Sequence, residues 1–113
     1  MKLISNTRLS GRRDLVNEIS EKVPRYIQVE ELKRAFPHGR IVRNEFLLGS
    51  LQGEAGQSLK IDINPSSPNF MRGKDFNTDE GIGGITKILM SAYNETVAEV
   101  AERFESYLSS GET

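Results

Sequence analysis

The fold is decided by residues 44–90, which read NEFLLGSLQGEAGQSLKIDINPSSPNFMRGKDFNTDEGIGGITKILM. Near the centre of this stretch Leu59, Ile61 and Ile63 alternate with polar residues. A period of two is typical of a strand with one buried and one exposed face. Residues 45–50 are apolar enough to form its partner, and the glycine-containing segment between the two predicts a hairpin loop.

Further elements are predicted on both sides of this hairpin. A third extended stretch is expected after the turn at Pro65–Pro68, and apolar residues recur at helical spacing in the flanking segments. The expected third strand covers residues 69–76, and the expected helices cover residues 10–23 (capped by Ser10), 29–36, a segment opened by Gly81–Gly84, and 96–108. Strands grouped between helices favour an α+β domain with a small antiparallel sheet of two to four strands, packed against flanking helices. We expect one domain over 1–113, with N-terminal helices (1–37), the sheet (38–80) and C-terminal helices (81–110).

Composition narrows the class of protein. The chain has 113 residues, no cysteine, one histidine and a net charge of −1. Disulfides and thiolate metal sites are therefore excluded, and no stretch approaches the roughly 20 apolar residues of a membrane-spanning helix. We expect a cytoplasmic protein that does not enter a membrane. The net charge is +3 over residues 1–37, +1 over 38–76 and −5 over 77–113, a polarity that could orient the domain on nucleic acid or simply reflect an acidic solvated helix.

The strongest candidate site consists of basic and aromatic residues on the predicted strands. If residues 69–76 form a regular strand, Phe70, Arg72, Lys74 and Phe76 share one face, with Lys60 on the neighbouring strand. Single-stranded nucleic acids are commonly held by cations that contact phosphates and rings that stack on bases. The alternative is that the phenylalanines belong to the core and the cations are merely solvated.

Three other groups of residues could form a functional site, and each also has a simpler structural explanation. The segment Gly81–Gly84 could present backbone N–H groups to a phosphate, but a tight strand-to-helix turn explains it better. Asp75, Asp79 and Glu80 could hold a hard cation, but the helix dipole alone favours acidic residues at this position. His38 lies between a proline and a glycine and is expected to be a surface residue.

Several short motifs in residues 37–90 occur in an order that resembles a known family. They are Pro37-His38-Gly39-Arg40, Glu45-Phe46-Leu47-Leu48-Gly49, Gly53-Glu54-Ala55-Gly56-Gln57-Ser58-Leu59, Gly73-Lys74-Asp75-Phe76-Asn77-Thr78-Asp79-Glu80-Gly81 and the Gly-Gly at 83–84. This order resembles the N-terminal zinc-ribbon domain of phage- and plasmid-type DNA primases and of related Toprim-containing replication proteins. The resemblance covers about half of the chain.

The chain departs from that family at the metal-binding positions. The resemblance places the two knuckles of the ribbon near Gly49 and Gln52 and near Asp75 and Thr78, where no cysteine or histidine is present. We therefore expect no structural zinc and no other cofactor. Helix packing has to supply the missing core, and the residues expected to do so are Leu15, Ile19, Leu32, Phe36, Ile88, Val100 and Phe104.

The resemblance implies a non-catalytic module that binds the single-stranded DNA template, as the N-terminal part of a longer replication protein whose downstream domain performs the chemistry. Contacts with phosphates are expected from Arg40, Arg43, Lys60, Arg72 and Lys74, and base stacking from Phe70 or Phe76. Two alternatives stay open. One is a protein–protein interaction or scaffolding domain that kept the fold but lost nucleic-acid binding. The other is a small enzyme that uses Asp75, Asp79 or Glu80 with His38.

Overall fold

The computed structural model describes residues 12–108, and these residues form an α+β fold, as the element order predicted. The helices are α2 (Arg12–Lys22), α3 (Arg25–Ala35), α4 (Ile85–Tyr93), α5 (Val97–Arg103) and α6 (Glu105–Leu108). The strands are β1 (Arg40–Val42), β2 (Glu45–Leu48), β3 (Leu59–Asp62), β4 (Arg72–Asp75) and β5 (Glu80–Gly83). The predicted helix cap Ser10 lies outside the described residues.

The five strands form one antiparallel sheet in the order β1-β2-β3-β4-β5, so each strand pairs with its neighbours in sequence. The sheet has one strand more than the two to four expected. The sequence did not indicate either edge strand, because β1 has only three residues, all exposed, and β5 contains two glycines. An edge strand has a partner on one side only, and neither segment shows the alternation of a half-buried strand.

The segment at residues 81–84 differs from its prediction as a helix opening. Gly81 and Gly83 belong to β5, where they pair with Lys74 and Arg72, and the helix begins only at Ile85. Gly84 has φ +91, a conformation that glycine adopts readily, and provides the corner between the sheet and α4.

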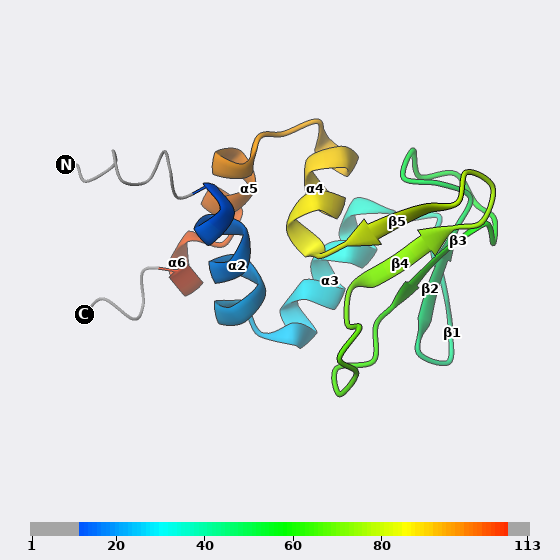
Figure 1. Cartoon of the computed structure of the whole chain (residues 1–113), viewed down its shortest axis with the longest axis horizontal. Coiled ribbons are helices and arrows are strands. Elements are labelled where there is room, and N and C mark those ends of the chain that lie inside the picture. Colours follow the sequence, from blue (N-terminus) through cyan, green and yellow to red (C-terminus); the bar gives the residue numbers. More distant parts are fainter. Residues whose placement is uncertain (1–11, 109–113) are drawn as a thin grey trace.

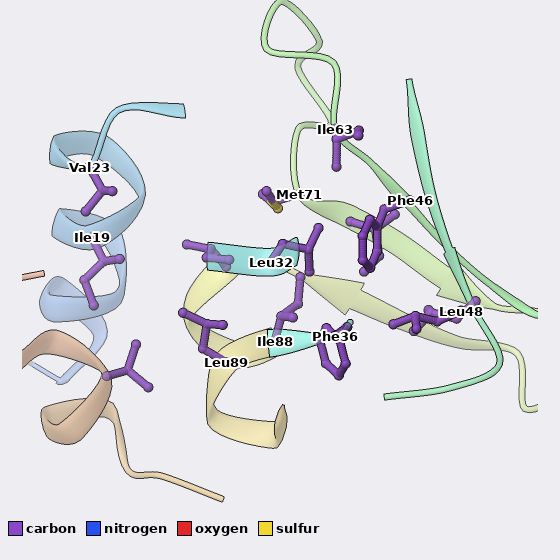
Figure 2. Packing of buried hydrophobic residues seen from close by; sticks show 14 of the residues in the cluster. Ile19, Val23, Leu32, Phe36, Phe46, Leu48, Ile63, Met71, Ile88 and Leu89 are labelled. Carbon is purple, nitrogen blue, oxygen red and sulfur yellow. The ribbon is translucent and has the colours of Figure 1, made fainter. Parts of the chain in front are cut away.

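All described helices lie on one side of the sheet, with α3 and α4 next to it and α2, α5 and α6 farther away (Figure 1). The core fills the space between these layers, and Figure 2 shows Phe46 of β2 and Met71 of the turn before β4 facing Leu32 and Ile88 of the helices. Six of the seven residues predicted to build this core are buried, and Leu15 is half-buried. Hydrophobic packing between sheet and helices therefore holds the described fold together.

Local signals explain where several helices start. Pro24 precedes α3, which begins four residues earlier than the helical spacing indicated, and its carbonyl accepts hydrogen bonds from two residues of the first turn. The predicted capping box at α5 is confirmed, since Thr96 accepts from the Glu99 N–H and the Glu99 carboxylate accepts from the Thr96 N–H. The buried Gln28 amide donates to the Val23 carbonyl at 2.9 Å and so ties α3 to the end of α2.

Candidate nucleic-acid interface

The face of the sheet opposite the helices carries a row of residues that crosses four strands. The Cα partners are Arg40 with Leu47, Leu47 with Lys60, and Lys60 with Lys74. Residues directly opposite each other in an antiparallel sheet share a face, and the alternate residues, such as Ile61, belong to the core. We call Arg40, Lys60 and Lys74 the cation row and this side of the sheet the outer face.

An exposed aromatic ring lies beside two members of this row. The Nζ atoms of Lys60 and Lys74 are 5.6 and 5.7 Å from the centroid of the Phe76 ring, which is 60% exposed. The Phe76 N–H donates to the Ser58 carbonyl at 2.6 Å and so continues the pairing of β3 and β4 beyond the end of β4. Because Phe76 is two residues after Lys74, it shares the outer face. Lys60, Lys74 and Phe76 form what we call the lysine–phenylalanine cluster.

Phe70 does not belong to this face, which corrects the expectation that residues 69–76 form one regular strand. Residues 69–71 form a turn, and Met71 has φ +65, which interrupts the alternation of side chains before β4 begins at Arg72. Phe70 is half-buried against the core, and its ring lies 4.7 Å from the Arg25 guanidinium. Of the two phenylalanines predicted to stack on bases, only Phe76 lies on the outer face.

The remaining predicted phosphate contacts are Arg72 and Arg43. Arg72 is two residues before Lys74 on β4 and therefore faces the same side of the sheet. Arg43 lies in the two-residue turn between β1 and β2, where its φ of 58° is uncommon for a residue with a side chain. The structure thus brings four of the five predicted cations to the outer face and leaves Arg43 in a turn at its margin.

The cations of the outer face differ from those of the helices in their partners. Among the described residues, Arg40, Arg43, Lys60 and Arg72 form no ion pair, and Lys74 pairs only with the exposed Asp79, at 2.6 Å. On the helices, by contrast, four cations pair with nearby carboxylates: Lys22, Lys33, Arg34 and Arg103. Lys60 and Lys74 are also direct neighbours, an arrangement of like charges that costs stability. The sheet therefore presents several unpaired cations, including Lys60 next to an accessible ring.

The outer face is not uniformly basic. Glu45 and Asp62 are Cα partners that lie two residues along the strands from the Leu47–Lys60 pair, so they share its face, on the opposite side of the row from Phe76. Asp62 accepts hydrogen bonds from the Ser67 hydroxyl at 2.6 Å and from the Asn64 N–H at 2.9 Å. These bonds use its oxygens to shape the turn after β3. Arg72 on β4 is level with Asp62, because the neighbouring residues Gly73 and Ile61 are Cα partners. Positive charge is consequently concentrated on the cation row itself, and the acidic pair lies between the row and the turn that contains Arg43.

Leu47 is a residue of the outer face that sequence reasoning did not single out. It is 6% exposed although it is not part of the core cluster between sheet and helices. Arg40 and Lys60 flank it in the register, and the aliphatic stems of long cationic side chains can cover an apolar neighbour in this way.

The two positions where the resemblance places metal-binding knuckles face one hollow of about 610 Å³. Its lining includes Gln52 from the loop after β2 and Asp75 and Thr78 from the β4–β5 hairpin. Among residues 12–108 no three histidine, cysteine or carboxylate side chains are grouped so that they could hold a metal ion. Asp75 instead accepts a hydrogen bond from the Asn77 N–H at 2.9 Å and shapes its own turn.

The structure separates the groups of the other candidates. Asp75 and Glu80 line the large hollow, whereas His38 lines a different one with Arg40, so the three do not share a cleft. The Gly84 N–H donates to the Met71 carbonyl at 3.0 Å and is not free to bind a phosphate. The hollow beside His38 was not foreseen, because it joins segments separated by fifteen residues or more.

Comparisons of the chain with protein-family models, curated proteins and solved structures gave no match. Among the described residues, no helix has the length and apolar character needed to cross a bilayer.

Proposed function

We propose that the chain is a non-catalytic module that binds single-stranded DNA on the outer face of its sheet. The observation that carries the proposal is the lysine–phenylalanine cluster, in which two neighbouring lysines flank one exposed ring. A base would stack on Phe76, and the adjacent phosphates would be held by Lys60 and Lys74. Further contacts along the DNA strand would come from Arg40, Arg72 and Arg43.

Two features support a single strand over a duplex. The ring of Phe76 can stack only on a base whose flat face is accessible, which is the case for unpaired nucleotides. The cations lie on a nearly continuous sheet surface and not on a helix that could enter a major groove. The resemblance to the template-binding domain of primases and related replication proteins supports DNA as the ligand and a downstream catalytic domain as the natural context.

Salt dependence gives a quantitative test. Five phosphate contacts predict a slope of log K against log salt of about −3.5 for single strands, a loss of roughly 100-fold in affinity between 50 and 200 mM salt. The double variant Lys60→Ala/Lys74→Ala should have a slope of about −2.1 and lose only about 20-fold over the same range. Fluorescence anisotropy with a labelled 20-nucleotide DNA measures both quantities.

A matched control comes from the helices. Lys22→Ala/Lys33→Ala removes the same charge from residues that are already paired with Glu18 and Glu30, so it should leave the slope near the wild-type value. Phe76→Ala should weaken binding by roughly 5- to 150-fold at constant salt, the range for the loss of one stacked base. Equal slopes for the two double variants would refute the proposal.

One observation favours a protein partner as the second candidate function. Strand β1 is an exposed edge of the sheet on which Ile41 and Val42 are 44% and 42% exposed. An exposed edge can accept a strand from another protein, and apolar side chains there add affinity. Replacing Val42 with lysine should abolish such an interaction. The substitution leaves the lysine–phenylalanine cluster intact and adds a positive charge to the outer face, so it should not weaken DNA binding.

A further inference from the structure

A second hollow lies at the β1 end of the cation row. It has a volume of about 220 Å³ and is lined by His38, Arg40 and residues 55–57 of the loop between β2 and β3. Arg40 forms no ion pair among the described residues, and no carboxylate lines the hollow. The nearest acidic residue in sequence, Glu54, accepts a hydrogen bond from the Ser50 hydroxyl at 2.8 Å instead. The lining of the hollow therefore includes one guanidinium and one imidazole and no carboxylate.

The loop that lines the hollow also carries backbone N–H groups without hydrogen-bond partners. Within the described part of the chain, the N–H groups of Ala55, Gly56 and Gln57 donate no hydrogen bond. The first half of the same loop is held by bonds from the Gly49 N–H to the Glu54 carbonyl at 2.7 Å and from the Gly53 N–H to the Ser50 carbonyl at 3.0 Å. The free donors thus follow directly after an ordered turn.

Gly56 fixes the second half of the loop close to the sheet. A Cβ atom at this position would lie 2.8 Å from the Gly49 Cα and 3.1 Å from its nitrogen, so only glycine permits the approach. The backbone of the loop therefore lies against the residue that follows β2, and the loop itself forms one wall of the hollow. This wall does not depend on a ligand for its shape.

We infer that this hollow binds a terminal phosphate of the nucleic acid held on the outer face. The inference rests on the proposed function, since Arg40 belongs to the same row as Lys60 and Lys74. Neighbouring strands are about 4.8 Å apart, which places Arg40 roughly 10 Å from Lys60 across the sheet. A single-stranded nucleic acid that stacks a base on Phe76 and runs along the cation row would reach the hollow within a few nucleotides.

The donors present favour a phosphomonoester over an internal phosphodiester. A monoester carries about −1.5 to −2 charges and three acceptor oxygens, whereas a diester has one charge and two free oxygens. The guanidinium of Arg40 can bind two of these oxygens side by side. The imidazole of His38 and the N–H groups of the loop remain for the third. An internal phosphate, with only two free oxygens, would leave some of these hydrogen-bond donors without an acceptor.

The test compares DNA 20-mers that carry a 5′-phosphate, a 3′-phosphate or no terminal phosphate, each with the fluorophore in the middle of the strand. One of the two phosphorylated strands should bind the wild-type chain roughly tenfold more tightly than the unmodified strand, as expected for added charge-assisted hydrogen bonds. His38→Ala should remove most of this difference without changing the affinity for the unmodified strand. Arg40→Gln should remove the difference and also weaken binding of all three strands.

A direct readout is available from NMR. Addition of the preferred phosphorylated strand should shift the amide resonances of Ala55, Gly56 and Gln57, and the unmodified strand should not. Equal affinities for all three strands, together with weakened binding by Lys60→Ala/Lys74→Ala, would overturn the terminal-phosphate site and leave the proposed function standing. If Arg40→Gln lowers the affinity for all three DNA strands by the same factor, Arg40 contacts an internal phosphate only, and the terminal-phosphate site is overturned. Absence of binding to every strand would overturn both proposals.

Discussion

The pairing of β3 with β4 depends on Gly73, and replacing this residue with alanine tests how the lysine–phenylalanine cluster is built. An added Cβ would lie 2.1 Å from the Lys60 carbonyl oxygen and 2.9 Å from the Ile61 Cα. Both are backbone atoms of β3, which cannot rotate away as a side chain could. Relief of the contact requires β4 to move about 1.3 Å from β3, because ordinary contacts begin near 3.4 Å.

A movement of this size lengthens the hydrogen bonds around Gly73 from about 2.9 Å to beyond 4 Å. Loss of two of them, with buried backbone groups left unpaired, should lower the free energy of unfolding by about 2–4 kcal/mol. A domain of this length has a total stability of about 5–15 kcal/mol, so the loss is a large fraction. With a urea m-value of about 1.5 kcal/mol/M, the unfolding midpoint should fall by roughly 1.3–2.7 M.

Gly81→Ala on the adjacent strand β5 is the matched control. No atom of the described chain lies within 4 Å of a Cβ built there, so the midpoint should change by less than about 0.3 M. Urea unfolding followed by circular dichroism measures both variants. A midpoint for Gly73→Ala within 0.3 M of that of Gly81→Ala would show that β3 and β4 do not pack as closely as the structure indicates.

Three further perturbations test the charges and caps. Asp79→Asn removes the ion-pair partner of Lys74 and should increase the affinity for single-stranded DNA about two- to fivefold in the anisotropy assay, the size of an exposed ion pair; an unchanged or weaker affinity would contradict a role for Lys74 in binding phosphate. Thr96→Ala removes the side-chain acceptor of the α5 capping box and should lower the free energy of unfolding by about 1 kcal/mol in urea titrations; no change would argue against this cap. The hydrogen bonds of Arg103 hold the pKa of the Glu95 carboxyl below its ordinary value of 4.5. The stability from this pair is present above pH 4.5 and is lost as the pH falls through the lowered pKa. Thermal unfolding should therefore show Glu95→Gln less stable than the wild type at pH 7, with the difference shrinking below pH 4.5, and a difference independent of pH would exclude the pair as its cause.

Local periodicity was sufficient to predict the elements that bury one regular face. The alternation of Leu59, Ile61 and Ile63 indicated a half-buried strand, and residues 59–62 form β3 at the centre of the sheet. The helical spacing that includes Ile88 and Val100 indicated core positions, and both are fully buried. Such patterns are informative because each reports the burial of a residue relative to neighbours only a few positions away.

The candidate site was predicted only in part, for a physical reason that Phe70 and Phe76 illustrate. Both lie at positions that a regular strand would place on one face, but the positive φ of Met71 rotates Phe70 out of that face and into the core. The positive φ of Met71 is uncommon for a residue with a side chain, and the pattern of apolar and polar residues in the sequence does not reveal it. Arg72, Lys74 and Phe76 follow this turn and keep their alternation.

The sequence by itself determined the α+β class, the central strand, most of the core and the cationic character of the segment around Lys74. Only the tertiary structure decided that Lys60 lies directly opposite Lys74, that Phe76 lies beside both, and that His38 and Arg40 share a hollow with residues 55–57. Register and loop packing depend on which distant segments bury surface together. No window of neighbouring residues contains that information, because the contacts form only when the whole sheet closes over the helices.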